Sequence, residues 1–93
     1  MKRLLVIGES LEELVRHLSP QLKRKVRYCL EEILENPDSG KELKQELLGL
    51  RSFKLGKLRI IYRKHPSAVE IITLGPRSTI YEKVALEIKH KKR

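Results

Sequence analysis

The order of apolar and polar residues divides the front half of the chain into one strand and two helices. An apolar run at 4–7 predicts a first strand that is buried on both faces, and Gly8 ends it. Two stretches with apolar residues at helical spacing follow, at 10–18 and 20–34. We expect these two helices to form an antiparallel helical hairpin that lies against the sheet.

Capping residues mark the ends of both predicted helices. Ser10 is the expected N-cap of the first helix, in a capping box with Glu13. The second helix is expected to begin at Ser19-Pro20, since serine caps well and proline fits the first helical position. It should stop at Asn36-Pro37, because proline disfavours helix for the residue before it.

The back half changes to a period of two, which is typical of strands. Three short strands are predicted between Leu47 and Leu74, with turns at Gly56-Lys57 and at His65-Pro66-Ser67. Gly75-Pro76 ends the last strand. Helical spacing then returns in a narrow apolar stripe of Ile80, Val84 and Ile88. Residues 41–48 fit either an extended lead-in or a short helical turn.

These elements predict an α+β fold in one domain. The expected architecture is a small, mainly antiparallel sheet packed on the N-terminal helical hairpin, with a C-terminal helix. Ninety-three residues suffice for a single core, so we assign 1–93 to one domain. Residues 89–93 are almost entirely cationic, and we expect them to form a mobile basic tail.

Strand alternation also predicts which side chains share a face. Ser52 and Lys54 should lie on one face of their strand, opposite Arg51, Phe53 and Leu55. On the next strand, one face should carry Arg59, Ile61 and Arg63, and the other Leu58, Ile60 and Tyr62.

The net charge of +9 comes entirely from the back half. Residues 1–50 contain nine Lys/Arg and nine Asp/Glu, whereas residues 51–93 contain twelve Lys/Arg and three acids. Such an asymmetry in so small a domain predicts a polyanionic partner, either nucleic acid or an acidic protein. A further cationic run at 23–27 is more often a solvated helix face than a phosphate contact.

Several kinds of site find no support in the sequence. The single cysteine, Cys29, excludes an internal disulfide and a cysteine zinc site, and its helical apolar setting indicates a buried small hydrophobe. The histidines, at 17, 65 and 90, have no metal-ligand spacing. We therefore expect no metal and no cofactor. The apolar run at 4–7 is too short for a signal peptide or membrane span, which predicts a cytoplasmic protein without a membrane partner.

Lys54, Arg59, Arg77 and Tyr81 remain as the residues that suit phosphodiester chemistry. Arginine forks bind phosphate and stabilise transition-state charge. A lysine crowded by other cations loses its proton more readily, so Lys54 is a candidate general base. Tyr81 suits base stacking, phosphate orientation or proton transfer. RNA fits better than DNA because it supplies its own nucleophile, the 2′-hydroxyl. A plain basic binding face remains the alternative.

Two motifs in this half resemble the RelE/ParE toxin superfamily. They are the Gly-x-x-Arg-Ile-Ile-Tyr hairpin at 56–62 and Leu74-Gly75-Pro76-Arg77 followed by Tyr81. The resemblance implies the toxin of a type II toxin–antitoxin module, with an antitoxin as partner. RelE-like members cut messenger RNA in the ribosomal A site, without metal and through the 2′-hydroxyl, whereas ParE-like members inhibit DNA gyrase.

The resemblance also assigns roles to residues of this chain. It implies catalysis by Lys54, Arg59, Arg77 and Tyr81, on a ribosome-bound message. We expect RNA contacts around them at Arg51, Ser52, Lys57 and Arg63. Ser52 departs from the pattern, because active ribonucleases often have Lys or Arg there. Ser52 therefore keeps a non-catalytic basic module as one alternative to an endoribonuclease. A ParE-like gyrase inhibitor is the other alternative, although such members generally lack the full ribonuclease set and Arg77 and Tyr81 are present here.

Overall fold

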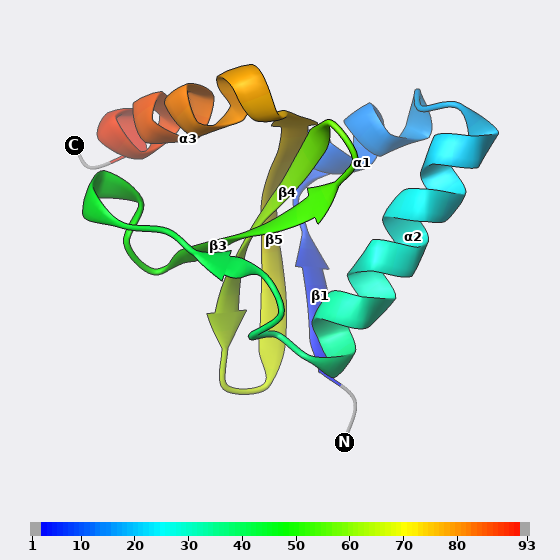
Figure 1. The fold of residues 1–93 in the computed structure, drawn as a ribbon, viewed down its shortest axis with the longest axis horizontal. Coiled ribbons are helices and arrows are strands. Elements are labelled where there is room, and N and C mark those ends of the chain that lie inside the picture. The colour runs from blue at the N-terminus through cyan, green and yellow to red at the C-terminus, as the bar shows by residue number, and fades with distance from the viewer. Residues whose placement is uncertain (1–2, 92–93) are drawn as a thin grey trace.

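A five-stranded sheet lies between two layers of helix in the computed structural model, which describes residues 3–91 (Figure 1). In chain order, the elements are β1 (Leu4–Ile7), α1 (Glu9–Arg16), α2 (Pro20–Glu35), β2 (Lys41–Glu42), the 3₁₀ turn η1 (Gln45–Leu47), β3 (Leu50–Leu55), β4 (Leu58–His65), β5 (Ala68–Pro76) and α3 (Arg77–Lys91). Helices α1 and α2 lie on one side of the sheet, and α3 lies with η1 on the other. The predicted α+β class and the C-terminal helix are confirmed.

The strand order is β1-β5-β4-β3-β2, and only the β1–β5 pair is parallel. Strand β1 therefore lies at an edge, with one neighbouring strand. Leu5 and Val6 are exposed, as is Leu4, at 70%. The expectation that this strand is buried on both faces was wrong, because of its four residues only Ile7 packs against an apolar core, the one under α1 and α2.

Strand β4 supplies side chains to two separate apolar cores. Ile60 and Tyr62 pack with residues of α1, α2 and β5, whereas Ile61 packs with Leu50 and with the α3 residues Ile80 and Val84. The predicted alternation on β3 and β4 is thus confirmed. A bulge opposite Ile61 and Tyr62 adds one residue, Ile72, to β5, and Ile72 packs on the α3 side.

The helix ends agree with the sequence for α2 and differ for α1. Ser19 accepts a hydrogen bond from the Leu22 backbone N–H at 3.3 Å, and α2 stops before Asn36, as predicted. Helix α1 begins at Glu9 with Gly8 as its N-cap. The assignment of Ser10 as N-cap was wrong, because the chain turns into the helix directly after β1 and leaves Ser10 inside the first turn.

Two further boundaries were not decided by the sequence pattern. Residues 41–48 contain both of the structures considered for them, the short strand β2 and the turn η1. Helix α3 begins at Arg77, directly after β5 and four residues before Tyr81. It continues to Lys91, so part of the expected basic tail is helical, and residues 92–93 lie outside the described residues.

The Tyr62 side chain fixes the loop between α2 and β2. Its hydroxyl is fully buried, donates to the Pro37 carbonyl at 2.7 Å and accepts from the Gly40 N–H at 2.9 Å. A Cβ on Gly40 would lie 2.5 Å from that hydroxyl oxygen, so only glycine fits. Arg51 donates to the Gly40 carbonyl at 2.8 Å and holds the loop from its other side.

Candidate functional site

Lys54 and Arg59 lie directly opposite each other on β3 and β4, on the face that α3 covers. Side chains in such a cross-strand pair have Cβ atoms about 5 Å apart. The two-residue turn Gly56-Lys57 sets this register, since Gly56 has a φ of 59° and glycine adopts that conformation without strain. The hairpin therefore brings two cations together beside its turn.

Arg77 joins these cations because α3 begins at the same end of the sheet. Its backbone N–H donates to the Lys57 carbonyl at 2.9 Å, which attaches the start of the helix to the hairpin turn. Gly75 is the cross-strand partner of Arg59. A Cβ on Gly75 would lie 2.9 Å from Ile80 Cδ1, so glycine allows the first turn of α3 to pack closely on β5. Figure 1 shows β5 ending and α3 beginning beside the β3–β4 turn.

Tyr81 lies one turn further along α3 and makes a hydrogen bond to the sheet. Its hydroxyl is 2.9 Å from Ser52 Oγ, and its half-buried ring packs against the second core. Ser52 is only 6% exposed. An RNA contact at Ser52, as the sequence predicted, would therefore have to pass through the Tyr81 hydroxyl.

The Arg59 guanidinium is folded toward the hairpin turn. Its Nη1 donates to the carbonyls of Gly56 at 2.9 Å and of Leu58 at 2.8 Å. Both of these bonds use the same nitrogen. Arginine has five N–H donors, so Nη2 and Nε remain to contact a phosphate.

The remaining predicted RNA contacts divide into one near the cluster and two distant from it. Lys57 is exposed in the turn itself. Arg63 shares the face of Arg59, but four residues of strand place it about 13 Å away, and its Nη1 is 3.5 Å from Glu70 Oε1. Arg51 lies on the opposite face, where it bonds the Gly40 carbonyl. The structure thus gathers Lys54, Lys57, Arg59, Arg77 and Tyr81, and leaves Arg51 and Arg63 apart.

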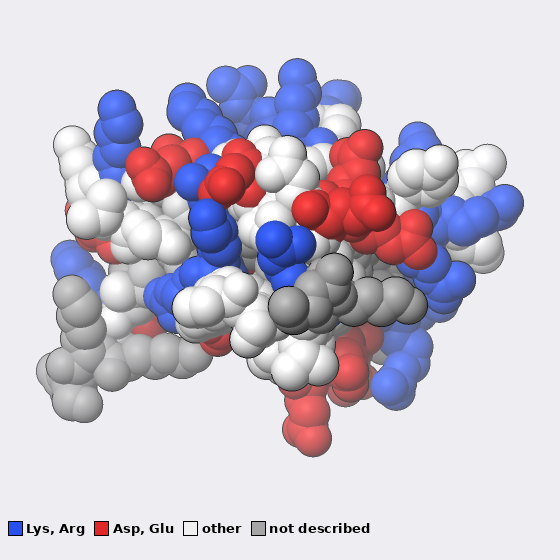
Figure 2. Space-filling view, turned by 90° about the horizontal axis from the view of Figure 1, so that it is seen from below, with Lys and Arg blue, Asp and Glu red and all other residues white. Residues whose placement is uncertain are grey.

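Acidic partners neutralise the cations at the other end of the sheet. Asp38 lies 2.8 Å from Lys64 Nζ and 3.3 Å from Arg51 Nη2. The hydrogen bond from Lys64, together with the charges of Lys64 and Arg51, lowers the pKa of the Asp38 carboxyl below its ordinary value. Figure 2 shows acidic and basic side chains intermixed at this end. Over residues 3–91, no ion pair involves Lys54, Lys57, Arg59 or Arg77, so this cluster keeps its charge.

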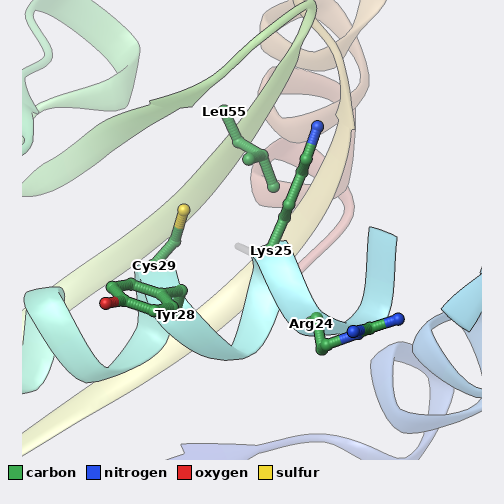
Figure 3. Close-up of a pocket in the computed structure, with 5 residues that line it drawn as sticks. All are labelled: Arg24, Lys25, Tyr28, Cys29 and Leu55. Carbon is green, nitrogen blue, oxygen red and sulfur yellow. The ribbon is translucent and has the colours of Figure 1, made fainter. Parts of the chain in front are cut away.

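A hollow on the opposite side of the sheet was missed by the sequence reasoning. It lies between α2 and the end of β3 and is lined by Arg24, Lys25, Tyr28, Cys29 and Leu55 (Figure 3). The sequence analysis assigned no function to Tyr28. The pattern that could have indicated one is an aromatic residue directly after the cationic run at 23–27. The Ser52–Tyr81 contact was also missed, because it depends on where α3 begins.

Two other kinds of site find no residues in the described part of the chain. No group of three or more His, Cys, Asp or Glu residues within 3–91 is placed to hold a metal ion. No helix there is both long and apolar enough to cross a membrane.

Comparisons with known proteins agree with this fold. A family model described as the ParE toxin of the type II toxin–antitoxin system parDE matches residues 8–81. No curated protein sequence matches the chain. Among solved structures, a mutant of the E. coli toxin RelE in the free state is similar, with 20% identity over 94% of this chain and 97% of that one, and a TM-score of 0.73.

Two toxin–antitoxin complexes contain similar chains. One is RelBE2 of Mycobacterium tuberculosis, with 22% identity over 83% of this chain and 100% of that one, and a TM-score of 0.72. The other is the archaeal RelE–RelB complex of Pyrococcus horikoshii, with 21% identity over 83% and 97%, and a TM-score of 0.67. These likenesses show the fold, and the family match extends over most of the chain. The chain therefore belongs to the ParE toxin family of the RelE/ParE superfamily, the toxins of type II toxin–antitoxin systems.

Proposed function

We propose that this toxin is a ribosome-dependent endoribonuclease, an mRNA interferase that cuts messenger RNA in the ribosomal A site. The observation that carries the proposal is the cluster at the β3–β4 turn. Lys54 and Arg59 face each other across the strands there, and Arg77 begins the helix tied to the same turn. Cations without a carboxylate partner in the described chain suit a site that must accept a phosphodiester.

The reaction would use the substrate's own nucleophile. The 2′-oxygen attacks the adjacent phosphorus and gives up its proton to a base, for which Lys54 and Tyr81 are the candidates. The bond from phosphorus to the 5′-oxygen breaks, and that oxygen takes up a proton as it leaves. The products are a 2′,3′-cyclic phosphate and a 5′-hydroxyl. Alignment of the 2′-oxygen and stabilisation of charge on phosphorus supply the rate enhancement.

Each arginine is assigned to the developing charge on the phosphate. Arg59 keeps Nη2 and Nε for this contact, while its Nη1 is held by the turn carbonyls. Arg77 is exposed and stands at the first position of α3, where the partial positive charge of the helix end adds to its own. Tyr81 is held by Ser52, so its hydroxyl has a fixed position.

The test is cleavage of a short message on purified ribosomes by the purified protein. Arg77→Ala should reduce the cleavage rate by about 10²- to 10³-fold, the usual effect of removing one transition-state charge donor. Arg16→Ala, which removes an exposed arginine from α1 on the opposite side of the sheet, is the matched control and should cut normally. A message with a 2′-deoxynucleotide at the cut position should resist cleavage by the parent protein and by Arg16→Ala. Full cleavage by Arg77→Ala would refute the assignment.

A second candidate is inhibition of DNA gyrase, which is favoured by the match of the ParE family model to residues 8–81. A gyrase supercoiling assay with the same protein separates the two functions. In cells, filamentation and DNA damage with continued translation would support gyrase, whereas arrest of translation with cut messages would support the ribonuclease.

The proposed partners follow from the same surface. A cognate antitoxin with an acidic segment would neutralise the cluster at the β3–β4 turn, and the similar chains of M. tuberculosis and P. horikoshii were solved in complexes with antitoxins. The ribosome and its message would be the other partners, which places the protein in the cytoplasm. Neither a cofactor nor a metal is part of the proposed reaction.

A further inference from the structure

The hollow between α2 and β3 combines an apolar floor, an aromatic wall and a cationic rim. Leu55 and Cys29 are half-buried, whereas Tyr28 is 73% exposed (Figure 3). Burial, and to a smaller extent the Glu32 carboxylate, raise the pKa of the Cys29 thiol, which therefore stays neutral. Lys25 extends past Leu55, and Arg24 lies on the side of Lys25 away from Leu55. The hollow is shallow and open to solvent, with a volume of about 260 Å³, so a flat ring could lie beside Tyr28 without entering a closed pocket.

The charge along α2 changes sign at Tyr28, because cations lie before it and the exposed acids Glu31 and Glu32 follow it. Between Pro20 and Leu30, the helix carries four cations, Lys23, Arg24, Lys25 and Arg27, and no acid. These residues extend the positive charge to the face of the sheet opposite the candidate catalytic cluster. A cationic helix surface beside an exposed aromatic ring is a combination that single-stranded nucleic acids bind. At Tyr28 that surface lies on the Arg24 and Lys25 side of the ring, and Glu31 and Glu32 lie on the other.

The hollow and the catalytic cluster lie back to back across the end of β3. Leu55 lines the hollow, while its neighbour Lys54 points to the α3 face. The β3–β4 turn, with Lys57 exposed, lies between them. One extended single strand of nucleic acid that passed over this turn would reach both the hollow and the cluster.

We propose that this hollow binds one unstacked base of a single-stranded RNA segment on the Tyr28 ring, with the neighbouring phosphates on Arg24 and Lys25. This inference goes beyond the proposed function, and it depends on that function only for the identity of the RNA. An acidic peptide is the weaker occupant, because the apolar floor and the aromatic wall give carboxylates nothing to bind. A base presents apolar faces to both surfaces.

The experiment measures the affinity of a fluorescent ten-nucleotide RNA by anisotropy, in the Arg77→Ala protein so that the catalytic cluster contributes less. Tyr28→Ala should weaken binding by roughly 5- to 150-fold, the usual effect of losing one base–aromatic stack. Tyr28→Phe keeps the ring and should bind within about threefold. Arg24→Gln should lower the salt slope by about 0.7 for the lost phosphate contact. Arg27→Gln removes the same charge outside the hollow and should leave the effect of Tyr28→Ala unchanged.

Three results would overturn the proposal. They are equal RNA affinity of Tyr28→Ala and its parent, a strong preference for DNA of the same sequence, and competition by poly-glutamate that depends on Tyr28. Ribosomal cleavage is scored separately. RNA binding that depends on Tyr28, without cleavage, would support the hollow and reject the ribonuclease. Cleavage with an RNA affinity indifferent to Tyr28 would reject the hollow alone.

Discussion

Removal of the Tyr62 hydroxyl should destabilise the protein strongly, although it lies far from the proposed chemistry. Tyr62→Phe leaves the Gly40 N–H and the Pro37 carbonyl without their partner in a fully buried position. Each buried group left unsatisfied costs about 1–3 kcal/mol, so the free energy of unfolding should fall by about 2–6 kcal/mol. For a domain of this size, that lowers the melting temperature by at least about 8 °C.

Urea unfolding followed by far-UV circular dichroism measures this loss directly. Tyr28→Phe is the matched control, because Tyr28 is exposed and should change stability by less than about 0.5 kcal/mol. Gly40→Ala adds a second test, since its Cβ would clash with the Tyr62 hydroxyl oxygen. The Gly40→Ala loss should be partly relieved in Tyr62→Phe, because the clash with the hydroxyl oxygen is removed while the one with ring carbon Cε1, at 2.7 Å, remains. A Tyr62→Phe protein as stable as the parent would show that the two hydrogen bonds do not hold the loop.

Two further predictions concern stability. Burial raises the pKa of the Tyr62 hydroxyl, so this contribution to stability is complete below the ordinary tyrosine pKa of about 10 and is lost as pH rises through the folded value. Urea midpoints between about pH 9 and 11 should fall more steeply for the parent than for Tyr62→Phe, and parallel curves would contradict this. Gln45 has a φ of 58°, so Gln45→Gly should raise the free energy of unfolding by about 0.5–1 kcal/mol, measured by urea unfolding; a loss of stability would count against backbone strain there.

The sequence predicted those parts of the fold that depend on local pattern. The faces of β3 and β4 follow from alternation, and the Gly56-Lys57 turn follows from its glycine, so the meeting of Lys54 with Arg59 was foreseeable. Both ends of α2 also follow from local capping residues.

The parts that were missed depend on contacts between distant segments. The parallel pairing of β1 with β5 places β1 at an edge, and no pattern within Leu4–Ile7 carries that information. The bond between Ser52 and Tyr81 joins residues 29 positions apart and requires α3 to begin at Arg77. In the sequence Arg51 looks like one more basic residue of the predicted RNA surface, but its guanidinium donates a hydrogen bond to the Gly40 carbonyl.

Lys54 and Arg59, which face each other on β3 and β4, link the proposed function to a measurable change in stability. Like charges directly opposite each other on a sheet are destabilising by about 0.2–1 kcal/mol, and Lys54 and Arg59 occupy such positions. A site that binds a polyanion needs cations close together, so the repulsion between Lys54 and Arg59 is a loss of stability that such binding would explain. Lys54→Glu should therefore raise the free energy of unfolding by up to about 1 kcal/mol and abolish ribosomal cleavage. Lys54→Gln should give about half the stability gain. A destabilised Lys54→Glu protein, or one that still cuts the message, would show that the pair is not kept for phosphate.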